Sequence, residues 1–192
     1  MNVAIIGASG YTGLELIKIL INHPKFNIAY IANSSGEMNV QDLHPCLKNV
    51  INMDVSLADA KEVAKVADLA FLALPHKTAM AFAKDLLNLG VKVVDLSADY
   101  RLSLENYEKH YCEHGDKEHI NEAVYGLPEY FRDEIKTARL IANPGCYPTA
   151  SLLALLPFID YIDTDAPIFI DAKSGVSGAG KNPSETTHYC QI

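Results

Sequence analysis

Apolar residues along the chain form short continuous runs that alternate with segments of helical spacing. Continuous runs predict buried strands at residues 3–6, 27–32, 69–74, 91–96 and 139–142, with a weaker strand at 53–55. Apolar residues at helical spacing predict helices at 14–21, 59–66, 78–89 and 104–114. Apolar strands that alternate with helices are typical of a parallel sheet covered on both faces. The pattern therefore predicts an α/β fold with a Rossmann-like, doubly wound parallel sheet.

The pattern changes in the last quarter of the chain. A helix at 150–159 is followed by one apolar strand, Pro167–Ala172, and by a glycine- and serine-rich loop at 174–184. A single strand without a partner does not form a stable sheet. We therefore expect residues 1–145 to form one Rossmann-like domain. Residues 146–192 would be the incomplete start of a second domain.

The segment GASGYTG, residues 7–13, connects the first predicted strand to the first predicted helix. Glycines in such a loop allow the backbone to approach a pyrophosphate, and the helix N-terminus offers free N–H groups to the anion. The spacing differs from GxGxxG, because Ala8 stands where the first glycine of that pattern would fall. The alternative is a tight turn without a ligand. Candidate cofactor-binding residues are Gly7, Ser9, Gly10, Tyr11, Thr12 and Gly13.

The end of the second predicted strand reads IANSSGE, residues 31–37, with no acid directly at the strand end. NAD-binding folds usually carry an acid there, which binds the ribose 2′-hydroxyl. The absence of that carboxylate removes a repulsion toward a 2′-phosphate, and the hydroxyls of Ser34 and Ser35 are suited to binding one. The sequence therefore favours NADP as cofactor. Glu37, reaching back toward the ribose, is the alternative.

A cysteine lies in the segment NPGCYPT, residues 143–149, between a predicted strand and a predicted helix. At a helix N-terminus the dipole stabilises a thiolate, which is the attacking form of cysteine. Cys146 is therefore a candidate nucleophile, and the side-chain amide of Asn143 is a candidate donor to an oxyanion. The alternative is a small buried hydrophobic residue, which describes most free cysteines.

Composition narrows the range of partners. The chain has 192 residues, of which 49% are apolar, and a formal net charge of −8, which disfavours nucleic acid as a partner. Its apolar run ASLLALLPFI is too short to span a bilayer. The four cysteines form no CxxC pair, and no His/Cys cluster indicates a metal site. We expect a cytoplasmic protein with reduced thiols, no bound metal and no membrane partner.

Six segments occur in the following order along the chain: GASGYTG, LPHKTA, VVDLSADYRL, YGLPE, ANPGCYPT and SGVSGAG. Together they resemble the N-acetyl-γ-glutamyl-phosphate reductases of the aspartate-semialdehyde-dehydrogenase-like family. The resemblance implies NADPH-dependent reduction of an acyl phosphate, N-acetyl-γ-glutamyl phosphate, to the semialdehyde in arginine biosynthesis. It implies that Cys146 is the nucleophile and that SGVSGAG, with Ser177 and Gly178, lies near the nicotinamide. It also implies that residues 1–145 are an NADP-binding Rossmann domain and that residues 146–192 are the start of an α+β catalytic and dimerisation domain. A homo-oligomer is expected for the whole enzyme.

Arg101 is the candidate for binding the substrate phosphate, and histidines are the candidates for the acid–base group. Arg101 follows a predicted strand, where α/β folds bind ligands, and a guanidinium matches phosphate geometry; pairing with Glu105 is the alternative. The resemblance places the acid–base histidine beyond SGVSGAG, where this sequence has only His188. His76 is expected to shape the cofactor pocket or cap the next helix, with a role as base the lesser alternative.

Two other interpretations remain open at this point. An enzyme of the aspartate-semialdehyde dehydrogenase type shares the cysteine chemistry and differs in the substrate pocket. A catalytically incomplete nucleotide-binding fragment would keep the glycine loop without turnover.

Three further histidines, His110, His114 and His119, fall in a charged stretch and are expected to be solvated.

Overall fold

The computed structural model describes residues 1–181 and divides into two compact units, Met1–Asn143 and Pro144–Ile192. His188 and Cys190 lie outside the described residues. The predicted division into domains 1–145 and 146–192 remains a prediction.

The first unit is built on one eight-stranded sheet with the order β3-β4-β2-β1-β5-β6-β8-β7. Neighbouring strands are parallel throughout, except that β3 and β4 are antiparallel. The predicted doubly wound parallel sheet is therefore confirmed. The strands are β1 (Asn2–Ile6), β2 (Asn27–Asn33), β3 (Met38–Asn39), β4 (Asp54–Leu57), β5 (Leu69–Leu72), β6 (Lys92–Asp95), β7 (Val124–Tyr125) and β8 (Leu140–Ala142).

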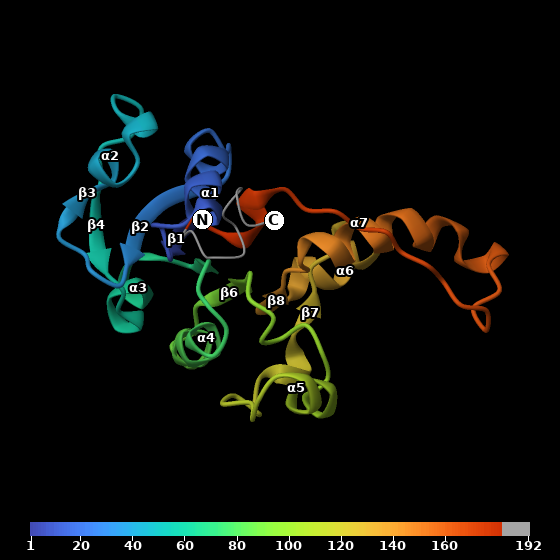
Figure 1. The fold of residues 1–192 in the computed structure, drawn as a ribbon. Helices are drawn as coiled ribbons and strands as arrows, with labels where there is room; N and C mark the ends of the chain where they lie inside the picture. The colour runs from blue at the N-terminus through green and yellow to red at the C-terminus, as the bar shows by residue number, and fades with distance from the viewer. Residues whose placement is uncertain (182–192) are drawn as a thin grey trace. The chain divides into compact units, whose positions relative to one another are not determined.

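Helices cover both faces of this sheet. Successive side chains of a strand point to opposite faces, so each face packs against a different set of helices. Val3 and Ile5 of β1 pack in one core cluster with Ile17 of α1, whereas Ala4 and Ile6 pack in a second cluster with α3, α4 and α5. Figure 1 shows α1 and α4 on opposite sides of the sheet. The helices of this unit are α1 (Tyr11–Ile21), α2 (Val40–Leu43), α3 (Ala60–Val66), α4 (Thr78–Asn88), α5 (Leu104–His110) and α6 (Pro128–Thr137), with 3-10 turns η1 (Pro45–Leu47) and η2 (Ile120–Glu122).

The second unit contains α7 (Cys146–Leu155), η3 (Leu156–Tyr161) and η4 (Val176–Ala179). The expected strand Pro167–Ala172 is wrong, because residues 167–175 have no regular secondary structure. An apolar run becomes a strand only where another strand accepts and donates its backbone hydrogen bonds, and no described residue does so here. The predicted helix 104–114 is also too long, since α5 ends at His110.

Two glycines let the turn between β1 and α1 pack against neighbouring backbone. Gly7 has φ +92°, and a Cβ there would lie 2.2 Å from the carbonyl oxygen of Ala73, just after β5. A Cβ on Gly13 would lie 2.6 Å from the carbonyl oxygen of Gly7. Gly10 differs, because no atom lies within 4 Å of the place a Cβ would take. Gly7 and Gly13 are thus required by packing, and Gly10 is not.

This difference predicts different stability effects for two alanine substitutions. Gly13→Ala should lower the free energy of unfolding by about 1–3 kcal/mol, because the added methyl group meets backbone atoms that cannot rotate away. Gly10→Ala should lower it by less than about 1 kcal/mol, the loss expected for glycine to alanine at a helix N-cap. Urea denaturation of both variants measures the difference, and equal losses would contradict the packing argument.

Candidate active site

The glycine loop presents the uncapped N-terminus of α1 at the carboxyl edge of the sheet. The backbone N–H groups of Gly7 and Ala8 both donate to the carbonyl of Ala32, at 2.9 and 3.0 Å, which fixes the start of the loop. α1 begins at Tyr11, and its N-cap residue Gly10 contributes no side-chain hydrogen bond. The positive end of the helix dipole favours an anion here, and no atom lies within 4 Å of the place a Cβ on Gly10 would take.

Two buried side chains, one at the end of β2 and one just after α2, hold the glycine loop. Asn33 donates from Nδ2 to Ser9 Oγ at 3.0 Å, and His44 contacts the carbonyl oxygen of Ala8 through Nε2 at 2.7 Å. A carbonyl only accepts hydrogen bonds, so His44 carries its proton on Nε2. Sequence reasoning missed His44, because a single histidine before a proline gives no signal of this contact.

The loop after β2 is a tight turn organised by Asn33. Its Oδ1 accepts the backbone N–H groups of Ser35 at 2.9 Å and Gly36 at 2.7 Å. Ser34 and Ser35 are exposed on this turn, as is Glu37, which has φ +56°. The side chain of Asn33 is therefore hydrogen-bonded to both predicted cofactor-binding segments, the glycine loop and the turn after β2.

The segment SADYR, residues 97–101, contacts the start of α4 through hydrogen bonds to Asp99. Asp99 is fully buried, and its Oδ2 accepts the backbone N–H groups of Lys77 at 2.9 Å and Met80 at 3.0 Å. Its Oδ1 accepts the hydroxyl of Tyr107 at 2.7 Å. α4 is therefore capped by a carboxylate distant in sequence, and the expectation that His76 caps this helix is wrong.

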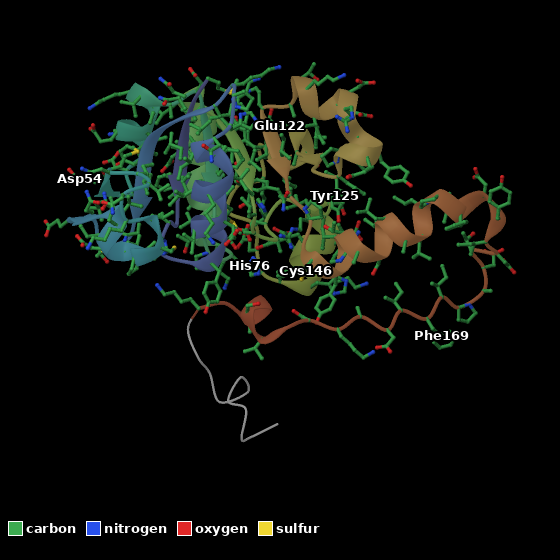
Figure 2. All side chains as sticks on the ribbon, turned by 90° about the horizontal axis from the view of Figure 1, so that it is seen from above. Asp54, His76, Glu122, Tyr125, Cys146 and Phe169 are labelled. Atoms are coloured by element: carbon green, nitrogen blue, oxygen red, sulfur yellow. The ribbon has the colours of Figure 1, made fainter. Side chains whose placement is uncertain are left out.

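His76 instead contacts the SADYR segment itself. Its Nδ1 accepts the backbone N–H of Ala98 at 3.0 Å, while the side chain stays 54% exposed. Asp99 Oδ1 lies 3.9 Å from Nδ1, too far for a hydrogen bond. His76 therefore stands after β5, at the edge of the sheet where the glycine loop lies (Figure 2), and its place in the cofactor pocket remains a prediction.

Two of the histidines expected to be solvated are buried. His114 is 1% exposed; its Nδ1 accepts the backbone N–H of Asp116, and its Nε2 donates to the carbonyl of Asp99. His119 is 7% exposed and bonds Asp116 through Nδ1 at 2.8 Å. Glu113, Lys117 and Glu118 are exposed, whereas Asp116 and the two imidazoles are buried, so the charged composition of this stretch does not predict its burial.

Arg101 bridges the ends of two neighbouring strands. Its Nε donates to the carbonyl of Asn143 and its Nη2 to the carbonyl of Leu96, both at 2.7 Å. Within residues 1–181 it forms no ion pair, so the alternative of a surface pair with Glu105 is not seen. The backbone N–H of Asn143 donates to the carbonyl of Asp95 at 2.8 Å and extends the β6–β8 ladder. The phosphate role of Arg101 and the oxyanion role of Asn143 remain predictions.

Cys146 is the first residue of α7 and is exposed, which does not fit a packing cysteine (Figure 2). Gly145 precedes it as N-cap without a side-chain hydrogen bond. The backbone N–H and the hydroxyl of Thr149 both donate to the carbonyl of Gly145, at 3.0 and 2.8 Å, and so fix the first turn of α7. A depression of about 430 Å³ is lined by Cys146, by further α7 residues and by residues 170–174. Ser177 and Gly178 lie exposed on η4 of the same unit.

Two family models match the chain. The NAD binding domain of semialdehyde dehydrogenase matches residues 2–138, and the dimerisation domain of semialdehyde dehydrogenase matches residues 146–192. The chain belongs to the semialdehyde dehydrogenase family. The glycine loop, the turn after β2 and the SADYR segment thus all lie within the residues that match the NAD binding domain model.

Several relatives are similar to this chain over its whole length. An N-acetyl-gamma-glutamyl-phosphate reductase of a Sulfurovum species is 60% identical over 192 residues, covering 100% of this chain and 57% of the relative. One from Wolinella succinogenes is 62% identical over 190 residues, covering 99% and 56%. The chain thus spans just over half the length of these relatives.

Solved structures share the fold at low identity. Aspartate semialdehyde dehydrogenase II of Vibrio cholerae has a TM-score of 0.60 at 20% identity, over 84% of this chain and 43% of that one. Aspartate semialdehyde dehydrogenase of Candida albicans, solved with NADP, has a TM-score of 0.58 at 18% identity, over 83% and 47%. At this identity the likeness extends to the fold alone.

The described residues contain neither a candidate membrane span nor a candidate metal site. No helix in residues 1–181 has the length and apolar character needed to cross a membrane. In the same range, no group of three or more His, Cys, Asp or Glu side chains is placed to hold a metal ion.

Asp95, at the end of β6, is a buried carboxyl group whose charge is disfavoured. Burial raises the pKa of Asp95 from its ordinary value of 3.8 to about 6, and the nearby charge of Asp99 adds to this. Hydrogen bonds from the backbone N–H and hydroxyl of Ser97 oppose the shift. The folded chain therefore holds this proton more tightly than the unfolded chain.

The raised pKa of Asp95 predicts a pH-dependent contribution to stability. The contribution is fully present below about pH 4 and is lost as the pH rises through about 6, in total about 3 kcal/mol. Asp95→Asn cannot ionise, so its free energy of unfolding should rise relative to wild type between pH 4 and pH 7.5. Urea denaturation across this range measures the change. Asp133→Asn, on a side chain 90% exposed, is the control; a parallel pH profile for D95N and wild type would contradict the prediction.

Proposed function

We propose that this chain is the cofactor-binding portion and nucleophile segment of an NADPH-dependent N-acetyl-γ-glutamyl-phosphate reductase, acting in arginine biosynthesis. The observation that carries the proposal is the set of relatives of that name, 55–62% identical over 97% or more of the chain. The uncapped start of α1 and the exposed cysteine at the start of α7 supply the two chemical features such an enzyme needs.

The cofactor would be held by segments already described. Residues 7–13 of the glycine loop would bind the diphosphate, with Gly10 giving the backbone close access. Ser34 and Ser35 would bind the 2′-phosphate, and Ser177 and Gly178 would lie near the nicotinamide. Bound NADPH supplies the hydride that reduces the acyl group.

Cys146 would open the reaction by nucleophilic attack. Its thiolate sulfur forms a bond to the acyl carbon, the bond from that carbon to the phosphate oxygen breaks, and inorganic phosphate leaves. The first turn of α7 stabilises the thiolate through its N–H groups and dipole. The Asn143 amide would donate to the oxyanion, and Arg101 would bind the phosphate through the guanidinium edge that holds no carbonyl.

Two alternatives are less well supported. Aspartate semialdehyde dehydrogenases share the fold at 17–21% identity, far below the identity of the reductases. A nucleotide-binding fragment without turnover would bind cofactor and form no thioester. The dimerisation-domain match supports a homo-oligomer with a small-molecule substrate, and a biosynthetic enzyme of this kind would be cytoplasmic.

Cofactor binding tests the first half of the proposal. The chain should bind NADPH several-fold more tightly than NADH, because the turn after β2 offers hydroxyls and no strand-end acid. Gly10→Ala should weaken NADPH by about tenfold or more, since a methyl group would occupy the space assigned to the diphosphate, while the protein stays folded. Calorimetric titration with both cofactors measures this. Tighter NADH binding, or unchanged NADPH binding in G10A, would refute the assignment.

Thiol reactivity tests the second half. Cys146 should react with iodoacetamide at neutral pH faster than Cys46, because α7 stabilises its thiolate. Cys46 is the matched control: it is also exposed, but it lies on the three-residue turn η1. Peptide mapping after brief labelling gives the order, and faster labelling of Cys46 would overturn the nucleophile assignment. A Cys146→Ser variant should form no thioester in a single turnover with the acyl phosphate.

A further inference from the structure

We infer that His44 is a positioning residue for the cofactor diphosphate: it holds the carbonyl of Ala8 and so keeps that oxygen turned away from the bound anion. The inference rests on the proposed function, because the diphosphate belongs to the cofactor proposed there. His44 lies outside the glycine loop, in a segment to which the proposed function assigns no role.

The contact between His44 and Ala8 joins two buried groups. His44 is 6% exposed, Ala8 is fully buried, and Nε2 of the imidazole lies 2.7 Å from the Ala8 carbonyl oxygen. Because a carbonyl only accepts hydrogen bonds, the imidazole donates through Nε2, and it does so in its neutral and in its protonated form. The hydrogen bond is therefore present whatever the charge of His44.

The backbone around His44 is held on both sides, which makes the imidazole a fixed donor. Its N–H donates to the carbonyl of Val40 at 2.9 Å, and its carbonyl accepts the N–H of Leu47 at 2.8 Å. Val40 and Leu47 are buried in the same apolar cluster as Ala8. The segment between β2 and β4 therefore brings His44 to the glycine loop and packs it there, although His44 and Ala8 are 36 residues apart in sequence.

The bond to His44 sets the orientation of one peptide group in the glycine loop. The peptide that links Ala8 to Ser9 is planar and trans, so its N–H end points opposite to its carbonyl, away from His44. The two preceding peptide groups are fixed as well, because the N–H groups of Gly7 and Ala8 donate to the carbonyl of Ala32 at 2.9 and 3.0 Å. Three consecutive peptide groups of the loop thus have a set direction.

This orientation suits a bound anion. A peptide carbonyl that faced the diphosphate would repel it, whereas peptide N–H groups attract it. Without the donor on His44, the Ala8 carbonyl would be buried and unpaired, which favours a rotated peptide that reaches another donor or water. The effect should be confined to the diphosphate, because the turn after β2, proposed to bind the 2′-phosphate, is held by Asn33 and not by His44.

The test compares His44→Leu, which removes the donor, with His44→Gln, whose side-chain amide keeps one. Two ligands are used: NADPH, and adenosine 2′-monophosphate, which carries the 2′-phosphate but no diphosphate. Dissociation constants are measured by calorimetry for wild type and both variants of the 192-residue chain, with circular dichroism as the check on folding. H44L should weaken NADPH by about tenfold or more and adenosine 2′-monophosphate by less than about twofold. H44Q should bind NADPH within about threefold of wild type.

Each other outcome overturns the inference in a distinct way. Unchanged NADPH binding in a folded H44L chain would show that the Ala8 carbonyl does not affect the diphosphate. Equal losses for the two ligands would indicate a general loosening, and an H44Q chain as weak as H44L would show that the donor is not responsible. An H44L chain that fails to fold would assign the contact to folding and not to the cofactor. Wild type that binds neither ligand would refute the proposed function as well, which separates the two failures.

Discussion

The close approach of the glycine loop to the end of β5 is the constraint on which the site depends. The Gly7 Cα lies so near the Ala73 carbonyl that no side chain fits between them, and Gly13 is packed as closely on Gly7. This contact sets where α1 begins relative to the sheet edge. Because Gly10 contributes no side-chain cap to α1, the positive end of the helix dipole lies at the sheet edge, where it favours an anion.

Asn33, His44 and Asp99 at this edge are buried and Arg101 is half-buried, and each is hydrogen-bonded to another segment of the chain. Asn33 and His44 hold the glycine loop, Asp99 caps α4, and Arg101 joins the ends of β6 and β8. Buried polar groups of this kind are stabilising only when every partner is in place, so they define one arrangement of the loops. The carboxyl edge of the sheet is therefore rigid where ligands of α/β folds bind.

The sequence predicted the parts of this structure that follow from local pattern. The central strands are continuous apolar runs, and the loop at residues 7–13 has the spacing of a strand–turn–helix unit, so both could be read directly. Strands β3 and β7 have two residues each, too few for a period to appear. The apolar run 167–172 reads as a strand but lacks one, since pairing and not composition decides strand formation. Buried His114 and His119 were missed for a related reason: their burial comes from tertiary contacts with Asp99 and Asp116.

The candidate site residues also divide into features that local sequence predicts and features that depend on tertiary contacts. Gly10, Cys146 and Ser34 could be proposed from motif and position, because each stands where a loop meets a strand or a helix. Arg101 was also proposed, yet sequence could not reveal that two of its donors hold the carbonyls of Leu96 and Asn143. For the proposed role of Arg101 in binding the substrate phosphate, this double contact has a consequence: the guanidinium edge used for the backbone is committed, so only the remaining N–H groups could donate to the phosphate. An arginine held in this way would meet a phosphate in a fixed orientation, with little loss of side-chain entropy on binding.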